Sequence, residues 1–284
     1  MILNLDPDFQ IHSTSNALSF DVFTFNGGEP HIKIKGALSA SSVVKITQRI
    51  RSFNDLGVLL TAIDALKRTG VEKIELFLPY FPAARQDRIM QAGEALTVKV
   101  YADLINALQL QKIQVFDPHS DVVPALLNNC EVLSNHLFIQ QVVKQIQEEV
   151  ILVSPDGGAL KKVYPLAQFL GGLEVVECSK KRNPKTGQLS DFQVYADDLK
   201  NKNCLIVDDI CDGGRTFIGL AKALRKKNAN QLYLAVSHGI FSRGFEELAQ
   251  YFEHIFTTDA FGDLEEMDGM TQILLKDLLV GNAD

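Results

Sequence analysis

The stretch "CLIVDDICDGGRTFIGLAKALRKK" (residues 204–227) decides the fold class of this chain. An apolar run ends in the acid pair Asp208 and Asp209, which is typical of a buried strand. The glycine pair after Asp212 predicts a tight turn, and apolar residues at helical spacing predict a helix over residues 216–227. A strand, a turn and a helix in this order indicate an α/β unit with a mostly parallel sheet.

The same alternation recurs along the chain, which predicts two such sheets. A helix is expected to begin near Asn54, as its cap. Further strands are predicted at residues 43–47, 73–80, 113–117, 150–154, 173–177, 231–237 and 254–259, and further helices at residues 95–108, 137–146, 159–170 and 243–252. A seam near residues 145–150 predicts an N-terminal domain over residues 1–147 and a C-terminal domain over residues 148–284.

The composition narrows the class of protein. With 284 residues, 46% of them hydrophobic and 22% charged, the chain has a normal globular composition. A net charge of −7 argues against nucleic acid as a partner, because phosphate backbones attract basic surfaces. No apolar run reaches transmembrane length and no signal peptide is recognisable, so we expect a cytoplasmic protein with no membrane partner.

Four polar clusters follow predicted strands, where ligands bind in parallel sheets. The ordinary glycine-rich nucleotide loops are absent. The clusters are "YFPAARQDR" (residues 80–88), "FDPHS" (116–120), "VSPDGGALKK" (153–162) and the opening stretch. The first three each allow two interpretations. Arginines after a strand suit phosphate and base contacts or a solvated loop. The Asp and His of the second cluster suit a metal or a phosphate, or capping and packing. In the third, the turn can bind an anion and Asp156 a cation, or Asp156 is a helix cap.

The opening stretch carries the strongest functional signal of the four. Asp208 and Asp209 are successive strand residues and point in different directions, so one of them can face a ligand. The turn after Asp212 exposes backbone N–H groups that can cradle a phosphate beside the hydroxyl of Thr216. The alternative is two capping acids and a tight turn.

Taken together and in this order, the clusters resemble those of ribose-phosphate diphosphokinases, the phosphoribosyl diphosphate (PRPP) synthetases. "PYFPAARQDR" is similar to that family's ARQD segment, and "VDDICDGGRT" to its PRPP-binding loop. "FNGGE" (residues 25–29) and "SHGIFS" (237–242) resemble further family segments, so the similarity covers nearly the whole chain.

The resemblance implies an α/β fold with two phosphoribosyltransferase-type domains. It also implies a reaction that moves the β,γ-diphosphoryl group of ATP to ribose 5-phosphate with Mg²⁺. ATP-binding residues would be Phe25, Glu29, Arg85, Gln86, Asp87 and His119, and metal-binding residues His119 and Asp156. Phe25 and Glu29 would reach adenine in a neighbouring subunit's site, which implies a homo-oligomer, at least a dimer, with a shared active site.

The catalytic and acceptor-binding residues come from the second half of the chain. The family's K-x-R pair corresponds to Lys180 and Arg182, although a basic surface loop is the alternative for this segment. The resemblance assigns acceptor binding to Asp208, Asp209, Asp212, Gly213, Gly214, Arg215 and Thr216.

The sequence departs from the family at informative positions. Gly27 stands where an Asp or Asn is usual, and the phosphate loop, usually D-T-A-G-T or D-T-C-G-T, reads Asp212-Gly213-Gly214-Arg215-Thr216 here. Glycine gives space and Arg215 adds a cation, which suits a larger acceptor such as ADP-ribose, used by some relatives in rebuilding NAD. A phosphoribosyltransferase would lack the ARQD segment, and an inactive regulatory relative would be expected to lose the catalytic pair.

Overall fold

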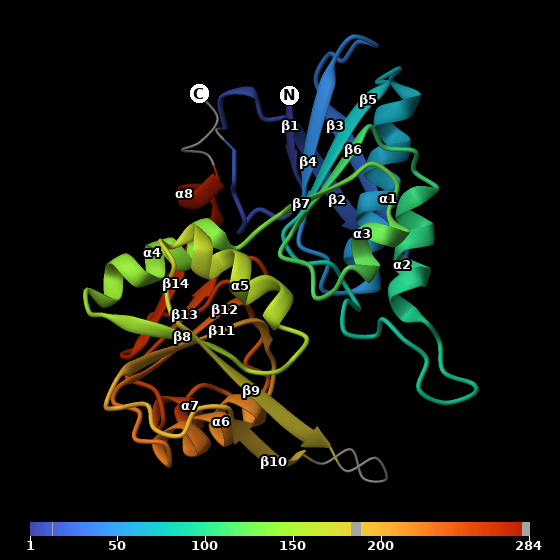
Figure 1. Ribbon diagram of the computed structural model, residues 1–284. Coiled ribbons are helices and arrows are strands. Elements are labelled where there is room, and N and C mark those ends of the chain that lie inside the picture. Colours follow the sequence, from blue (N-terminus) through green and yellow to red (C-terminus); the bar gives the residue numbers. More distant parts are fainter. Residues whose placement is uncertain (13, 183–188, 280–284) are drawn as a thin grey trace. The chain divides into compact units, whose positions relative to one another are not determined.

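The computed structural model describes residues 1–12, 14–182 and 189–279 (Figure 1). The chain divides into two compact units. The first comprises Met1–Ser134, Ala260–Asp263 and the chain from Leu275 on, and the second comprises Asn135–Asp259 and Leu264–Leu274. The sequence places its boundary between residues 147 and 148 instead, and that domain boundary stays a prediction.

The first unit is built on a five-stranded parallel sheet in the order β1-β4-β5-β6-β7. Its strands are β1 (Ile2–Asn4), β4 (Val43–Thr47), β5 (Lys73–Leu78), β6 (Lys112–Phe116) and β7 (Cys130–Leu133). The helices are α1 (Phe53–Arg68), α2 (Thr97–Asn106), α3 (Val122–Leu126) and α8 (Leu275–Leu279), with a short 3₁₀ turn, η1 (Thr14–Asn16). Leu59, Ile63 and Leu66 of α1 are fully buried, because helical spacing puts them on one face.

An antiparallel hairpin of β2 (Ser19–Thr24) and β3 (Pro30–Lys35) forms a separate two-stranded sheet in the first unit. It packs against α1, where a side chain at Gly57 would come within 2.8 Å of the Pro30 ring. The glycine therefore allows the close approach of helix and hairpin.

The second unit contains a seven-stranded sheet in the order β10-β9-β8-β11-β12-β13-β14. Its strands are β8 (Val150–Ser154), β9 (Val175–Arg182), β10 (Leu189–Val194), β11 (Asn203–Cys211), β12 (Leu232–Gly239), β13 (His254–Thr258) and β14 (Met270–Ile273). Only β10 runs antiparallel among these described strands. Helices α4 (His136–Ile146) and α5 (Leu160–Phe169) lie on one face, and α6 (Arg215–Arg225) and α7 (Glu246–Ala249) on the other (Figure 1).

The strands β8, β11 and β12 form the centre of this sheet, and nearly all of their residues are buried. Such continuous apolar runs are expected where helices cover both faces of a parallel sheet. The predicted α/β class with mostly parallel sheets is therefore confirmed. Among the described residues, no helix is both long and apolar enough to span a bilayer.

A buried arginine joins distant parts of the chain within the first unit. The guanidinium of Arg49 is 1% exposed and donates hydrogen bonds to Asp6 (2.7 Å) and to both carboxylate oxygens of Asp263 (2.9 and 3.0 Å). It also lies 5.1 Å from the centre of the Phe9 ring. These contacts fix Asp263 against the segment between β4 and α1.

Among the differences from the sequence prediction, three concern α7, α1 and β9. Helix α7 covers only Glu246–Ala249 instead of residues 243–252, because Gly244 adopts a left-handed conformation (φ +81°) that no helix accommodates. Ser52, not Asn54, caps α1, in a reciprocal capping box with Asp55. Strand β9 extends to Arg182, well past the predicted end at residue 177.

Candidate active site

The first unit brings together two of the predicted clusters, residues 80–88 and 116–120. They follow β5 and β6, which are neighbours in the sheet. The hydroxyl of Ser120 donates to Asp87 Oδ2 (2.8 Å), and the guanidinium of Arg88 donates to Asp87 Oδ1 (2.9 Å). Asp87, 9% exposed, thus links the two segments.

The electrostatics of Asp87 follow from these bonds. Burial alone raises the pKa of this carboxyl, but the hydrogen bonds from Arg88 and Ser120 and the nearby His119 outweigh burial and lower the pKa. Arg85 and Gln86 are exposed and His119 is half-buried. The roles of these residues in ATP binding stay predictions.

The tip of the β2–β3 hairpin carries Phe25 and Glu29, and both are exposed. The backbone N–H of Phe25 donates to the carbonyl of Glu29 (2.9 Å), which closes the turn. A side chain at Gly27 would come within 2.5 Å of the Glu29 carboxylate, so glycine leaves room for that carboxylate.

Two further aromatic residues accompany Phe25 on the hairpin, and the sequence prediction missed them. The Phe25 ring lies 5.0 Å from Phe23 and 5.7 Å from His31, between ring centres. Phe23 and His31 are directly opposite in the strand pairing. Alternation along β2 puts Phe23 and Phe25 on one face, and this pattern could have identified the cluster.

In the second unit, Asp156 is held at the turn between β8 and α5. Its Oδ1 accepts the backbone N–H groups of Gly158 (2.9 Å) and Ala159 (3.1 Å), and its Oδ2 lies 2.5 Å from Lys180 Nζ. Burial alone raises the pKa of Asp156, but the Lys180 ammonium and these N–H groups lower it below its usual range. Lys180 reaches Asp156 because β9, its strand, pairs with β8.

Strand β9 also carries Arg182, whose side chain lies outside the described part of the chain. Its predicted catalytic role stays a prediction. Lys180, by contrast, has a defined position and is paired with an acid.

Asp208 and Asp209 lie inside β11, which continues to Cys211, and not at its end as predicted. Asp208 is half-buried and Asp209 is 6% exposed. Burial and the neighbouring carboxylates of Asp209 and Asp156 raise the pKa of Asp208 well above its ordinary value. A cation or a hydroxyl donor at this position would relieve the repulsion between these acids.

The loop after β11 exposes backbone groups at the start of α6. Gly214 adopts a left-handed conformation (φ +71°, ψ −13°) that favours glycine, and no side chain of the described residues caps the helix there. Asp212 accepts a hydrogen bond of 2.5 Å from the Ser242 hydroxyl, and Arg215 is exposed. Thr216, in the first turn of α6, is half-buried. Of the predicted acceptor-binding residues, Asp212, Gly213 and Gly214 thus form the loop, Arg215 and Thr216 begin α6, and Asp208 and Asp209 lie in the preceding strand.

The donor chemistry of the described side chains bears on which of them could hold a metal. Within the described part of the chain, no group of three or more His, Cys, Asp or Glu side chains is placed to hold a metal ion. Mg²⁺ commonly uses one or two carboxylates together with water and substrate phosphates, and Asp156 offers such a carboxylate. The donor chemistry at Asp156 therefore fits Mg²⁺.

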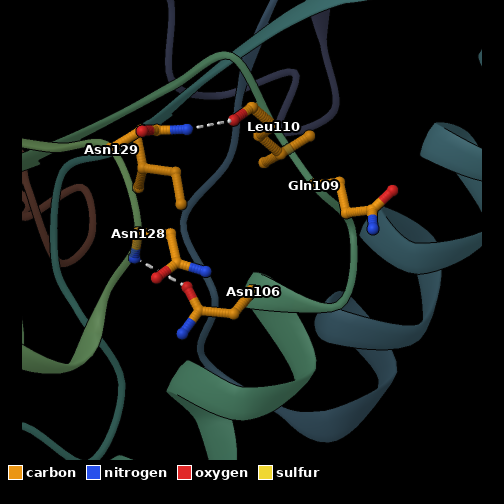
Figure 2. A pocket seen from close by; sticks show the side chains of 6 residues that line it. Asn106, Gln109, Leu110, Asn128 and Asn129 are labelled. Atoms are coloured by element: carbon orange, nitrogen blue, oxygen red, sulfur yellow. Dashed lines mark hydrogen bonds between the residues drawn. The ribbon is translucent and has the colours of Figure 1, made fainter.

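The first unit also contains a hollow of about 220 Å³ that includes none of the predicted site residues (Figure 2). It is lined by Asn106, Gln109, Leu110, Ile113, Asn128 and Asn129. Its amides are used internally, since Asn106 accepts the backbone N–H of Asn128 (2.8 Å) and Asn129 donates to the Leu110 carbonyl (3.0 Å). It lies at the amino ends of β6 and β7, opposite to the edge where parallel sheets bind ligands.

Comparison with known families identifies both halves of the chain. The N-terminal domain of ribose phosphate pyrophosphokinase matches residues 10–108, and the phosphoribosyl transferase domain matches residues 124–266. The structure resembles that of phosphoribosylpyrophosphate synthetase from Mycobacterium smegmatis with a TM-score of 0.85, over 99% of this chain and 96% of that one, at 22% identity. This likeness shows the fold.

Curated relatives agree with these matches. A ribose-phosphate pyrophosphokinase of Mycoplasma pneumoniae is 33% identical over 237 residues, which are 82% of this chain and 70% of the relative. Another, from Thermococcus kodakarensis, is 30% identical over 229 residues, 80% of each chain. The chain therefore belongs to the ribose-phosphate pyrophosphokinase family and is a transferase of the diphosphokinase type.

Proposed function

We propose that the protein transfers the β,γ-diphosphoryl group of ATP to the anomeric hydroxyl of ribose 5-phosphate, giving PRPP and AMP. The anomeric oxygen bonds to the β-phosphorus of ATP, the bond from that phosphorus to the oxygen shared with the α-phosphorus breaks, and AMP leaves. The anomeric hydroxyl loses its proton. Such transfers need positioning and charge neutralisation more than covalent help.

The observation that carries this proposal is the arrangement of Lys180 beside Asp156. Lys180 Nζ is 2.5 Å from a carboxylate that backbone N–H groups already hold in place. A positioned ammonium can neutralise the negative charge that develops on the transferring group. Lys180 is therefore the residue to which we assign charge stabilisation, with Arg182 as its expected companion.

Binding of the acceptor falls to the residues of β11 and the loop after it. Asp208 and Asp209 would accept hydrogen bonds from the ribose hydroxyls. The backbone N–H groups of Gly213–Thr216 would hold the 5-phosphate at the start of α6. This division agrees with the chemistry of each group, since carboxylates accept from hydroxyls and N–H groups donate to phosphate.

ATP and Mg²⁺ complete the proposal. Mg²⁺ would supply charge neutralisation on the phosphates, with Asp156 among the residues that hold it. Arg85, Gln86, Asp87 and His119 would contact ATP. Asp156 belongs to the second unit and His119 to the first, so their shared role at one metal stays a prediction. A cytoplasmic location also stays a prediction.

The oligomer is part of the same proposal, since Phe25 and Glu29 would reach the adenine of a neighbouring subunit. Mixing two variants, Phe25→Ala and Lys180→Ala, tests it. Unfolding and refolding the two together should give hybrids with intact sites, and AMP release above that of either variant alone. Activity no higher than the sum of the separate variants would contradict a shared site.

A second acceptor is favoured by one observation, the exposed guanidinium of Arg215 in the phosphate loop. It suits ADP-ribose, whose diphosphate is larger than a terminal phosphate. The test supplies ATP, Mg²⁺ and either acceptor and measures AMP release. Turnover with ribose 5-phosphate far above that with ADP-ribose supports the first acceptor, and the reverse supports the second. No AMP with either would leave the regulatory alternative, a relative without activity.

A further inference from the structure

The side chain of Arg243 lies directly over the phosphate loop, at Gly213. A Cβ atom added to Gly213 would be 3.2 Å from Arg243 Cδ and 3.3 Å from Arg243 Nε. Arg243 is exposed and directly follows the segment "SHGIFS" (residues 237–242). Its guanidinium therefore begins within contact distance of the loop that is expected to hold the acceptor.

The sheet explains why Arg243 comes to this loop. Strands β11 and β12 are neighbours, with Cys211 opposite Gly239, so the residues after both strands meet at one edge. The backbone N–H groups of Ile240 and Phe241 donate to the Cys211 carbonyl. Ser242 is bonded to Asp212 twice, by its N–H (3.2 Å) and by its hydroxyl (2.5 Å). Ser242, which precedes Arg243, is thus held by hydrogen bonds to Asp212, which precedes Gly213.

The backbone at Gly213 does not require glycine, whereas the space above it is partly filled by the Arg243 side chain. Gly214 has a positive φ of 71°, but Gly213 is not among the residues with positive φ. A side chain at position 213 would be acceptable to the backbone, and what it would meet is the Arg243 side chain. A side chain at position 213 would therefore be in tight contact with Arg243 in its present position.

The guanidiniums of Arg215 and Arg243 both lie near the phosphate loop. Arg215 follows the glycine pair and Arg243 lies against its first member, and both are exposed. For neither does the described part of the chain contain an acidic partner. A terminal phosphate can be satisfied by N–H groups and a hydroxyl, whereas two added guanidiniums match a second anionic group through paired hydrogen bonds.

We propose that Arg243 is an acceptor-binding residue that, with Arg215, selects an acceptor whose ribose 5-phosphate is part of a diphosphate ester. The inference rests on the proposed diphosphoryl transfer, but it takes the second acceptor, ADP-ribose, in place of ribose 5-phosphate at the same site. Arg243 would contact the outer phosphate of the diphosphate. The space above Gly213 is what lets its side chain reach that phosphate.

The test compares Arg243→Ala with Lys226→Ala, which removes the same charge beyond the opposite end of α6. Binding of ADP-ribose and of ribose 5-phosphate is measured by calorimetry, and KM and kcat by AMP release. For Arg243→Ala we expect the Kd and KM of ADP-ribose to rise about 10- to 100-fold, which is the range of a charged hydrogen bond. The Kd and KM of ribose 5-phosphate should rise less, and the KM of ATP should not change. Lys226→Ala should match the wild type.

The outcomes separate this inference from the proposed function. If the wild type releases no AMP with either acceptor, the proposed function fails, and calorimetry alone still decides the role of Arg243. Wild-type protein that does not bind ADP-ribose, or equal losses for both acceptors in Arg243→Ala, would overturn the acceptor class. An unchanged Kd in Arg243→Ala would overturn the role of the residue.

A second variant tests the link between the two positions. Gly213→Thr should displace the Arg243 side chain and weaken ADP-ribose binding by a factor similar to that of Arg243→Ala. Combined with Arg243→Ala it should add little, because the contact is already lost. Losses that multiply in the double variant would show that Gly213 and Arg243 act separately, and would overturn the link.

Discussion

At the scale of single residues, Lys180 connects the structure most directly to catalysis. Its ion pair with Asp156 holds a cation next to the acids of β11. We expect Lys180→Ala to lower the kcat of AMP formation about 100- to 1000-fold, the usual cost of removing a group that stabilises developing charge. Lys202→Ala is the control, since Lys202 pairs with Glu174 on the surface. Activity retained by Lys180→Ala would remove Lys180 from the mechanism.

Asp87 gives a pH dependence at the same scale. Its pKa is lowered in the folded protein, so the carboxylate stabilises the fold above the unfolded pKa of about 3.9, and this stability is lost as pH falls through the folded pKa. Asp87→Asn should therefore be less stable than the wild type at pH 7. The difference should shrink from about pH 5 downward, as urea unfolding at several pH values would show. A difference that is constant with pH would contradict this origin, and Asp64→Asn at an exposed pair is the control.

At the scale of elements, helix α6 is positioned by a glycine. A side chain at Gly219 would come within 2.2 Å of the Phe192 ring on β10, so helix and strand approach as closely as glycine allows. Gly219→Ala should force them apart and cost about 1–3 kcal/mol despite the better helix propensity of alanine. Chemical unfolding measures this, and Phe192→Leu in the same chain should recover part of the loss. Equal stability of Gly219→Ala and wild type would show that α6 is not held this way.

The elements also show how far the sequence could be interpreted. The strands at residues 43–47 and 150–154 were predicted with the bounds that the structure has, because apolar runs and β-branched residues define them locally. The hairpin of β2 and β3 was missed, since most of its residues are exposed and its stabilising contact is with α1. Helix α7 was predicted too long because apolar spacing does not reveal the conformation of Gly244.

The candidate site also contains residues that the sequence could identify and residues that it could not. Motifs identified the loop of Asp212–Thr216, but they could not find Arg243, whose position depends on the pairing of β11 with β12. The family resemblance suggested Lys180, but only the pairing of β8 with β9 brings it to Asp156. Contacts between neighbouring strands of a parallel sheet join residues far apart in sequence, and a single sequence does not specify them.

At the scale of the whole molecule, the buried arginine of the first unit matters most for stability. Burial alone lowers the pKa of Arg49, but hydrogen bonds to Asp263 and Asp6 outweigh burial and raise it, so the guanidinium stays charged. Arg49→Met would leave Asp6, 6% exposed, without its main partner, and we expect a cost of about 3–5 kcal/mol. Thermal and urea unfolding measure it. The control is Arg68→Ala, at an exposed pair on α1, which should have the stability of the wild type. Wild-type stability of Arg49→Met would show that the buried network is unimportant.

The same network has a consequence for the order in which the chain is made. Asp263 follows Arg49 by 214 positions, and nearly all of the second unit lies between them. A chain emerging from the ribosome exposes the sheet of the first unit early, and Arg49 can then pair with Asp6 but not yet with Asp263. The first unit is therefore synthesised first but completed last, because most of the second unit is synthesised before Asp263. Translation pauses before residue 263 should leave nascent chains in which the N-terminal unit is open to proteases.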